Sequence, residues 1–317
     1  MTTSAALTRK QLLILIGGFA ALALLVMIWR WGGTVEDSLA YFNTARYLRG
    51  EIPASELRAP FPYRLLAPAL AAAIPGDTRQ SFALLNWLCI SATAVMMTLA
   101  ALRAGIGRKG AVIAGLLLLL SVPTFWYAPY LLTDPASLCA RAAFVLAVLS
   151  GQPWLAAVAG VAGAAVREEN ILLLVWLLAM RRIAIMPGLV ALAAAGAWMV
   201  AVRWWLIPGL PSYVWAPSIY TVITALKDVR SLASLVTAAG LVLPLALLGM
   251  RGSASSAPAL QPLKSLLLLM VLPPLYAALC VRIDGRAIWG LYPMLAPFAA
   301  LWLAARLEQW TPAKVPA

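Results

Sequence analysis

The sequence predicts an all-α protein, a polytopic bundle of about ten transmembrane helices. Two observations predict this class. Of the 317 residues, 63% are hydrophobic and only 11% are charged, whereas soluble domains carry roughly 25% charged residues. Apolar segments approaching the roughly 20 residues that a helix needs to cross a bilayer also recur through the whole length of the chain. We therefore expect an integral membrane protein with a single domain, residues 1–317, and no soluble domain.

Ten apolar segments are predicted to be membrane helices, at 11–31, 81–102, 110–127, 135–150, 154–166, 171–181, 187–207, 232–250, 265–281 and 287–305. The first segment follows Arg9 and Lys10, as a signal peptide would. It is too long for a signal sequence, and the stretch from Arg30 to Gly33 offers no small-x-small cleavage site. We interpret it as a retained first helix.

The segments 154–166 and 171–181 are each too short to cross a bilayer, and Arg167-Glu168-Glu169-Asn170 separates them. They form either one helix with charges at mid-membrane or a hairpin of two short helices. The positive-inside rule favours the hairpin, because it leaves the basic loops on one side and both termini in the cytoplasm. The residues then cytoplasmic are Arg9, Lys10, Arg103, Arg108, Lys109, Arg181, Arg182, Arg251, Lys264, Arg306 and Lys314.

This topology places almost all carboxylates on the outer side. Of the 11 acidic residues, only Glu308 is cytoplasmic. Many arginines also fall outside, against the usual charge bias, and the net charge is +13. Such a pattern indicates an anionic ligand or lipid headgroup at the outer face, with ordinary solvation of loops as the alternative.

The sequence contains no histidine. This excludes His-based triads, His-ligated metals and imidazole bases, so any acid–base chemistry falls to carboxylates. The three cysteines, Cys89, Cys139 and Cys280, are isolated in apolar stretches and lack the spacing of a zinc or redox motif. They are interpreted as small core residues.

The first outer loop, about 32–80, is the longest polar stretch. Thr34 with Asp37 resembles a capping box, and Gly50 is a helix stop. The apolar positions at helical spacing between them are Leu39, Phe42, Ala45 and Leu48. We expect an amphipathic helix in the membrane interface, with Glu36 and Asp37 in its first turn. The alternative role for Asp37 is to cap that helix and complement its dipole.

Four further outer positions carry candidate functional side chains. The proline-rich stretch that follows the first loop helix holds Arg58, Tyr63 and Arg64 on a stiff path. Thr133 or Asp134 can cap the helix that begins at Pro135. Arg167 lies at the hairpin tip. Arg286 either anchors the last helix at the interface or donates two parallel hydrogen bonds to a phosphate.

Together these segments resemble the GT-C superfamily of polyprenyl-phosphate-dependent glycosyltransferases. The first loop of that superfamily is similar to residues 35–50, VEDSLAYFNTARYLRG, followed by Pro60-Phe61-Pro62-Tyr63-Arg64. The second signature resembles residues 130–135, YLLTDP, and the third the small-residue helix from Ala156 to Glu168. Arg286 with Pro293 is similar to the C-terminal Arg and Pro pattern. The acidic pair here is Glu-Asp without an intervening residue, and there is no soluble outer domain.

The resemblance implies an enzyme that transfers a sugar from a polyprenyl-phosphate donor to an acceptor hydroxyl on the extracytoplasmic face. It implies Asp37 as the base, with Glu36 second, and Asp134 as a residue that shapes the site or assists a metal. The implied donor and lipid-phosphate site comprises Arg58, Tyr63, Arg64, Arg167, Glu168 and Arg286.

No cofactor is required, and Mg²⁺ or Mn²⁺ is an option. The partners are then the donor, a glycan or lipid acceptor and membrane lipids, without nucleic acid. The expected location is a bacterial inner membrane, in glycan biosynthesis for the cell envelope.

Two other functions compete with this one. A transporter or flippase of a lipid-linked anion would also use charged residues in the membrane, but such proteins carry internal repeats and this sequence shows none. A non-catalytic assembly subunit would use the same outer loops to bind a partner protein.

Overall fold

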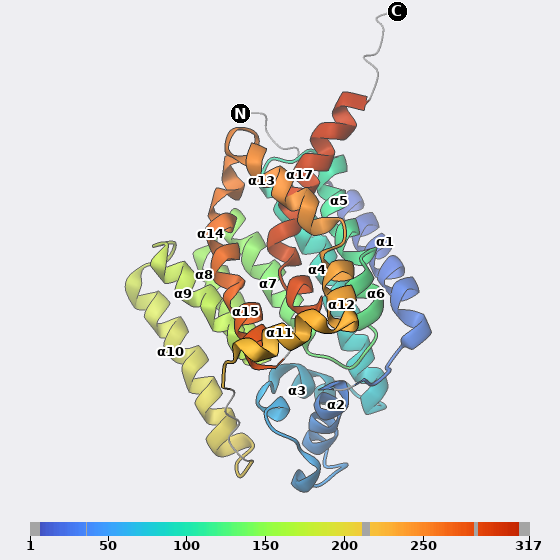
Figure 1. The fold of residues 1–317 in the computed structure, drawn as a ribbon, viewed down its shortest axis with the longest axis vertical. Coiled ribbons are helices and arrows are strands. Elements are labelled where there is room, and N and C mark those ends of the chain that lie inside the picture. Colours follow the sequence, from blue (N-terminus) through green and yellow to red (C-terminus); the bar gives the residue numbers. More distant parts are fainter. Residues whose placement is uncertain (1–6, 36, 211–215, 282–284, 311–317) are drawn as a thin grey trace, which may run out of the picture.

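The computed structural model describes residues 7–35, 37–210, 216–281 and 285–310, and these are helical apart from turns and loops (Figure 1). The helices of the first half are α1 (Arg9–Met27), α2 (Asp37–Leu48), α3 (Leu66–Ala73), α4 (Thr78–Arg103), α5 (Arg108–Leu119), α6 (Val122–Tyr127), α7 (Asp134–Leu149) and α8 (Pro153–Val166). Those of the second half are α9 (Ile171–Ala179), α10 (Ile185–Ala201), α11 (Ile219–Lys227), α12 (Val229–Ala239), α13 (Val242–Ser256), α14 (Gln261–Met270), α15 (Leu272–Cys280), α16 (Gly285–Trp289) and α17 (Tyr292–Trp310). Short helical turns are η1 (Ile28–Arg30), η2 (Ala54–Glu56), η3 (Phe61–Tyr63), η4 (Glu168–Asn170), η5 (Val202–Leu206) and η6 (Pro258–Leu260).

Four continuous helical segments are long and apolar enough to cross a membrane: Arg9–Arg30, Thr78–Arg103, Ile185–Leu206 and Pro258–Cys280. The pair α12 and α13, bent by 46°, raises the number to five if it forms one span. These segments are consistent with an integral membrane protein. The expected total of about ten membrane helices stays a prediction, because most of the other helices in the described residues are shorter.

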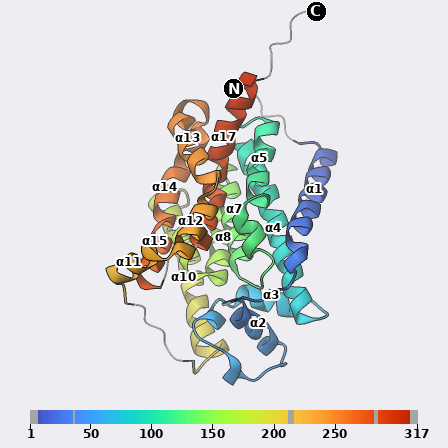
Figure 2. The same ribbon diagram turned by 45° about the vertical axis from the view of Figure 1, so that its right-hand side comes forward.

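The helices are arranged so that the loops predicted to lie outside gather at one end of the bundle. Figures 1 and 2 show the start of α1 and the end of α17 at one end and α2 and α3 at the other. We call the end that carries α2 and α3 the outer end, and the end that carries the start of α1 and the end of α17 the inner end. Helix α10 runs towards the outer end, so the turn between α9 and α10 lies at the end of α10 that is further from α2 and α3 (Figure 1). Each predicted side of the membrane therefore corresponds to one end of the molecule.

The core of the bundle is formed by α4, α5, α7, α13 and α17, which pack on one another along their lengths. Small residues allow close approach of the backbones, as membrane helices require. The tightest example is Gly249 of α13, where an added Cβ would overlap the carbonyl of Phe298 in α17. Helix α17 therefore packs closely against α13 in the centre of the bundle.

The segment 154–181 forms the predicted hairpin. Helices α8 and α9 pack against each other, and η4 forms the tip with Arg167 and the two glutamates. The charged residues therefore lie at the outer end and not within a continuous helix. This resolves the two readings of the sequence in favour of two short helices.

Helix α2 begins at Asp37 and ends at Leu48, and the predicted stop residue Gly50 follows with a φ of +72°. One face of α2 packs on the bundle and the other is exposed. The side chains buried against the bundle include Tyr41 and Ala45, whereas Leu39 is exposed. The reason is that α2 packs on α3 and α4, so the face that carries Tyr41 turns inward.

The outer loop is held to the bundle by Arg49. Its Nε donates to the carbonyl of Ala72 at 2.9 Å, and its terminal nitrogens reach the carbonyls of Ile74 and Gly76 and the hydroxyl of Thr78. The last carbonyls of a helix lack intrahelical donors. At the end of α3, Arg49 donates the missing hydrogen bonds to these carbonyls. This arginine is therefore structural and not free for a ligand.

The sidedness can be tested with single cysteines in a cysteine-free background. Ser55 in η2 and Gln152 in the turn before α8 are both exposed and lie at opposite ends. We expect Ser55→Cys to react with an impermeant thiol reagent from the outside, and Gln152→Cys only after permeabilisation. Reaction of both from the same side would contradict the topology.

Candidate functional site

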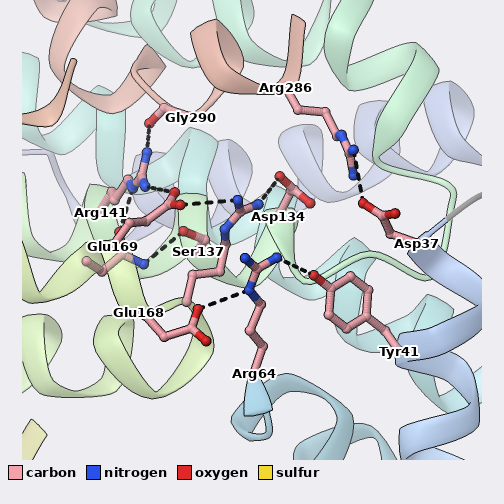
Figure 3. A network of polar contacts seen from close by, with 12 residues as sticks. Asp37, Tyr41, Arg64, Asp134, Ser137, Arg141, Glu168, Glu169, Arg286 and Gly290 are labelled. Carbon is pink, nitrogen blue, oxygen red and sulfur yellow. Dashed lines mark hydrogen bonds and ion pairs between the residues drawn. The ribbon is translucent and has the colours of Figure 1, made fainter. Parts of the chain in front are cut away.

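Arginines and carboxylates from four distant parts of the chain converge at the outer end (Figure 3). The first loop, the start of α7, the hairpin tip and α16 each contribute to this ionic network. Its members are Asp37, Tyr41, Arg64, Asp134, Ser137, Arg141, Arg167, Glu168, Glu169, Asn170 and Arg286. Since both ends of the sequence contribute, the site exists only in the folded bundle.

Arg64 connects the proline-rich loop to α2 and to the hairpin tip. Its Nε donates to Glu168 Oε2 at 3.0 Å, and its Nη1 donates to the hydroxyl of Tyr41 at 2.6 Å. Glu168 also accepts from Arg203 at 3.5 Å. The predicted site residues Arg64 and Glu168 are therefore paired with each other.

Arg167 links Asp134 to Glu169. Its Nη1 is 2.6 Å from Asp134 Oδ1, and its Nη2 is 3.2 Å from Glu169 Oε2. Asp134 is only 6% exposed, and neither it nor Thr133 caps α7 with its side chain. The expected capping role is wrong, because the Asp134 carboxylate faces Arg167 instead. Its Oδ2 is buried and has no hydrogen-bond partner among the described residues.

Arg141 is the most deeply buried charged residue of the network, with 3% exposure. Its Nε donates to Asn170 Oδ1 at 2.7 Å, Nη2 to Glu169 Oε1 at 2.5 Å, and Nη1 to the carbonyl of Gly290 at 2.8 Å. Asn170 in turn donates to Ser137 Oγ at 2.9 Å. All three guanidinium nitrogens are thus satisfied, which a buried charge requires.

Arg286 joins the network to a large cavity. Its Nη2 lies 3.1 Å from Asp37 Oδ2, and both side chains are partly buried. Arg286 also lines a cavity of about 1110 Å³ that lies between α6, α11 and α12. Trp126, Ala225 and Ala238 are among the residues that give this cavity a largely apolar wall. A ligand with a long apolar part and an anionic end matches such a space.

The charges at the hairpin tip are held ionised by their neighbours. Burial by itself raises the pKa of Glu169, but Arg167, Arg141 and Arg64 outweigh it and lower that pKa to about 2. For Glu168, burial also raises the pKa, and Arg64 is the main cause of the net lowering. Both glutamates are therefore paired with arginines in their ionised form.

Two predicted site residues lie outside the network. Arg58 is exposed and makes no ionic contact with any residue that the structure describes. Tyr63 packs beside Val202 and Ile207, and its ring lies 4.8 Å below the Arg203 guanidinium. Arg203, which also donates to Glu168, therefore links Tyr63 to the network. Glu36, the second candidate base, falls outside the described residues.

Sequence reasoning missed Tyr41, Ser137, Arg141, Glu169 and Asn170 as site members. A signal for Arg141 was present, since an arginine inside an apolar helix marks a functional or paired position. It also follows Asp134 by seven residues, which places both on one face of α7.

No group of three or more Asp, Glu or Cys side chains that could hold a metal ion lies within the described residues. Asp134, Glu168 and Glu169 each face an arginine instead. These carboxylates therefore do not present the converging oxygen ligands that Mg²⁺ or Mn²⁺ takes. We assign no step to a metal.

Comparison with known proteins gives no match, either to a protein-family model or to a curated protein.

The pH dependence of stability tests the hairpin-tip network. A carboxylate with a lowered pKa stabilises the fold above its ordinary pKa, and this contribution is lost as pH falls through the folded value. We expect the unfolding temperature of the wild type to fall as pH drops from about 4.5 towards about 2. In Glu169→Gln this acid dependence should be weaker, although the variant is less stable at neutral pH by about 3 kcal/mol.

The matched control is Glu56→Gln, at an exposed carboxylate in η2. This variant should keep the acid dependence of the wild type. Equal slopes for wild type and Glu169→Gln would show that Glu169 does not carry the effect.

Proposed function

We propose that the protein is a membrane glycosyltransferase that moves a sugar from a polyprenyl-phosphate donor to an acceptor hydroxyl on the extracytoplasmic side. The observation that carries the proposal is the Asp37–Arg286 pair beside the large cavity. It sets a carboxylate base 3.1 Å from a guanidinium, next to a space lined by apolar side chains. A base and a phosphate-binding cation are the two groups that this reaction needs.

In the proposed reaction, the lipid of the donor occupies the cavity and its phosphate contacts Arg286. Asp37 accepts the proton of the acceptor hydroxyl. The acceptor oxygen then forms a bond to the anomeric carbon, and the bond from that carbon to the phosphate oxygen breaks. The electron pair of the broken bond leaves with the polyprenyl phosphate, whose charge Arg286 stabilises.

Donor binding and base activation are connected in this proposal. Asp37 accepts a hydrogen bond from Arg286, and a phosphate at Arg286 competes for the same donor groups. Exchange of this partner would free the Asp37 carboxylate for the acceptor. The acceptor would therefore be deprotonated only when the donor is in place.

The position of the charges supports an enzyme over a transporter. The ionic contacts of the network lie at the outer end of the bundle (Figure 3). A translocation path would instead need polar groups through the depth of the membrane. Transfer of a sugar at the outer face needs only a cavity for the lipid and a phosphate site at that face.

Replacement of the proposed base tests the reaction. Asp37→Asn keeps an oxygen that accepts from Arg286 but cannot take a proton, so donor turnover should fall roughly 100-fold or more. Turnover of labelled polyprenyl-phosphate sugars is measured with purified protein, together with the unfolding temperature. Glu36→Gln is the matched neighbour and should stay active. Loss in Glu36→Gln alone would move the base to Glu36, and full activity in both variants would contradict the mechanism.

Replacement of the phosphate-binding cation tests the donor site. Arg286→Lys keeps the charge but loses the planar pair of donors, so kcat/KM for the donor should fall roughly 10-fold or more. Arg46→Lys is the control, because Arg46 lies in α2 at the same end, pairs with Glu51 and does not line the cavity. If Arg286→Lys and Arg286→Ala both keep full activity, Arg286 is only an interfacial anchor.

A further inference from the structure

A second cavity lies at the inner end, away from the ionic network. It has a volume of about 570 Å³ and is formed by the turn between α9 and α10 and the beginning of α8. Arg181 and Arg182 line it together with Trp154 and Ile185. The proposed reaction makes no use of this cavity.

The two arginines in this cavity differ from those of the network. At the outer end, Arg64, Arg167 and Arg286 each lie within 3.1 Å of a carboxylate oxygen. In the part of the chain that the structure describes, the side chains of Arg181 and Arg182 make no hydrogen bond and no ion pair. Two neighbouring cations without a protein partner are available for an anion.

The backbone of Arg181 shows that an arginine is not the residue this turn favours. After α9, the amide of Arg181 donates to Leu178 and that of Arg182 donates to Leu177. The same pair of hydrogen bonds ends α2, α4 and α7, where the equivalent positions are Gly50, Gly105 and Gly151. Arg181 has a φ of +50° and is the one non-glycine residue with positive φ among the described residues. Strain of this kind is retained where a side chain has a function.

The surroundings of the cavity are those of a membrane surface. Trp154 is 63% exposed and Ile185 is 70% exposed, and tryptophan is enriched at the level of lipid headgroups. The first amides of α10 have no helical acceptor, and Ala184 before them provides no side-chain cap. An anion in the cavity would therefore meet guanidinium groups and free amides, with apolar side chains beside them.

We propose that this cavity binds the phosphate headgroup of an anionic membrane phospholipid in the leaflet at the inner end. Basic pockets between membrane helices on the cytoplasmic side bind such headgroups, and the positive-inside pattern assigns this end to the cytoplasm. A lipid is the occupant because the exposed Trp154 and Ile185 would contact its glycerol and acyl chains. The inference does not depend on the proposed function.

The test is the unfolding temperature in phosphatidylcholine nanodiscs, with and without phosphatidylglycerol. We expect phosphatidylglycerol to stabilise the wild type. Arg181→Gly should raise the unfolding temperature in phosphatidylcholine alone, because glycine relieves the positive φ. The same variant, and Arg182→Gln, should each lose roughly half of the stabilisation by phosphatidylglycerol, since two cations share the phosphate.

Lys109→Gln is the control for general charge, because Lys109 is exposed at the inner end but does not line the cavity. It should keep the phosphatidylglycerol effect. Three results would overturn the proposal: full stabilisation in the Arg181→Gly, Arg182→Gln double variant, an equal loss in Lys109→Gln, or the same stabilisation of the wild type by inorganic phosphate in phosphatidylcholine nanodiscs.

Discussion

The outer end of the molecule depends on how one buried guanidinium is satisfied. Arg141 lies inside α7, where an unpaired charge would cost several kcal/mol. Its partners are Glu169 and Asn170 at the hairpin tip and the Gly290 carbonyl before α17. Each partner is the end of a structural element, so satisfying the charge also fixes these ends relative to α7. Arg167 lies at the same hairpin tip, and Arg286 lies in α16 just before Gly290. Fixing these two segments therefore also positions both arginines.

The network is closely balanced in charge, and this affects how a ligand is selected. Arg64, Arg167 and Arg286 are already matched by carboxylates at 2.6–3.1 Å. Long-range attraction of an anion is therefore weak, despite the net charge of +13. In the proposed reaction, a phosphate would exchange with a carboxylate at short range, and this exchange would select a headgroup by its shape more than by its charge alone.

The sequence predicted the components of this site better than their pairing. The positive-inside rule identified the hairpin, and outer position identified Asp37, Arg64, Asp134, Arg167 and Arg286. The pairs could not be predicted, because partners such as Asp37 and Arg286 are 249 residues apart. The face of α2 that packs on the bundle could not be predicted from the sequence, because its contacts with α3 and α4 select that face. The count of membrane spans stays open because helices such as α7 and α8, at 16 and 14 residues, are short.

The contacts of the last segment have a consequence for biogenesis. Helix α17 closes the core against α13, and the turn before it supplies the Gly290 carbonyl to Arg141. During synthesis, α7 is complete long before this carbonyl has been translated. The nascent chain must then hold Arg141 with an incomplete set of partners until the ribosome releases the C-terminal helix. A chain that terminates before Gly290 would lack this acceptor permanently, and Arg141 would stay buried with one terminal nitrogen unpaired.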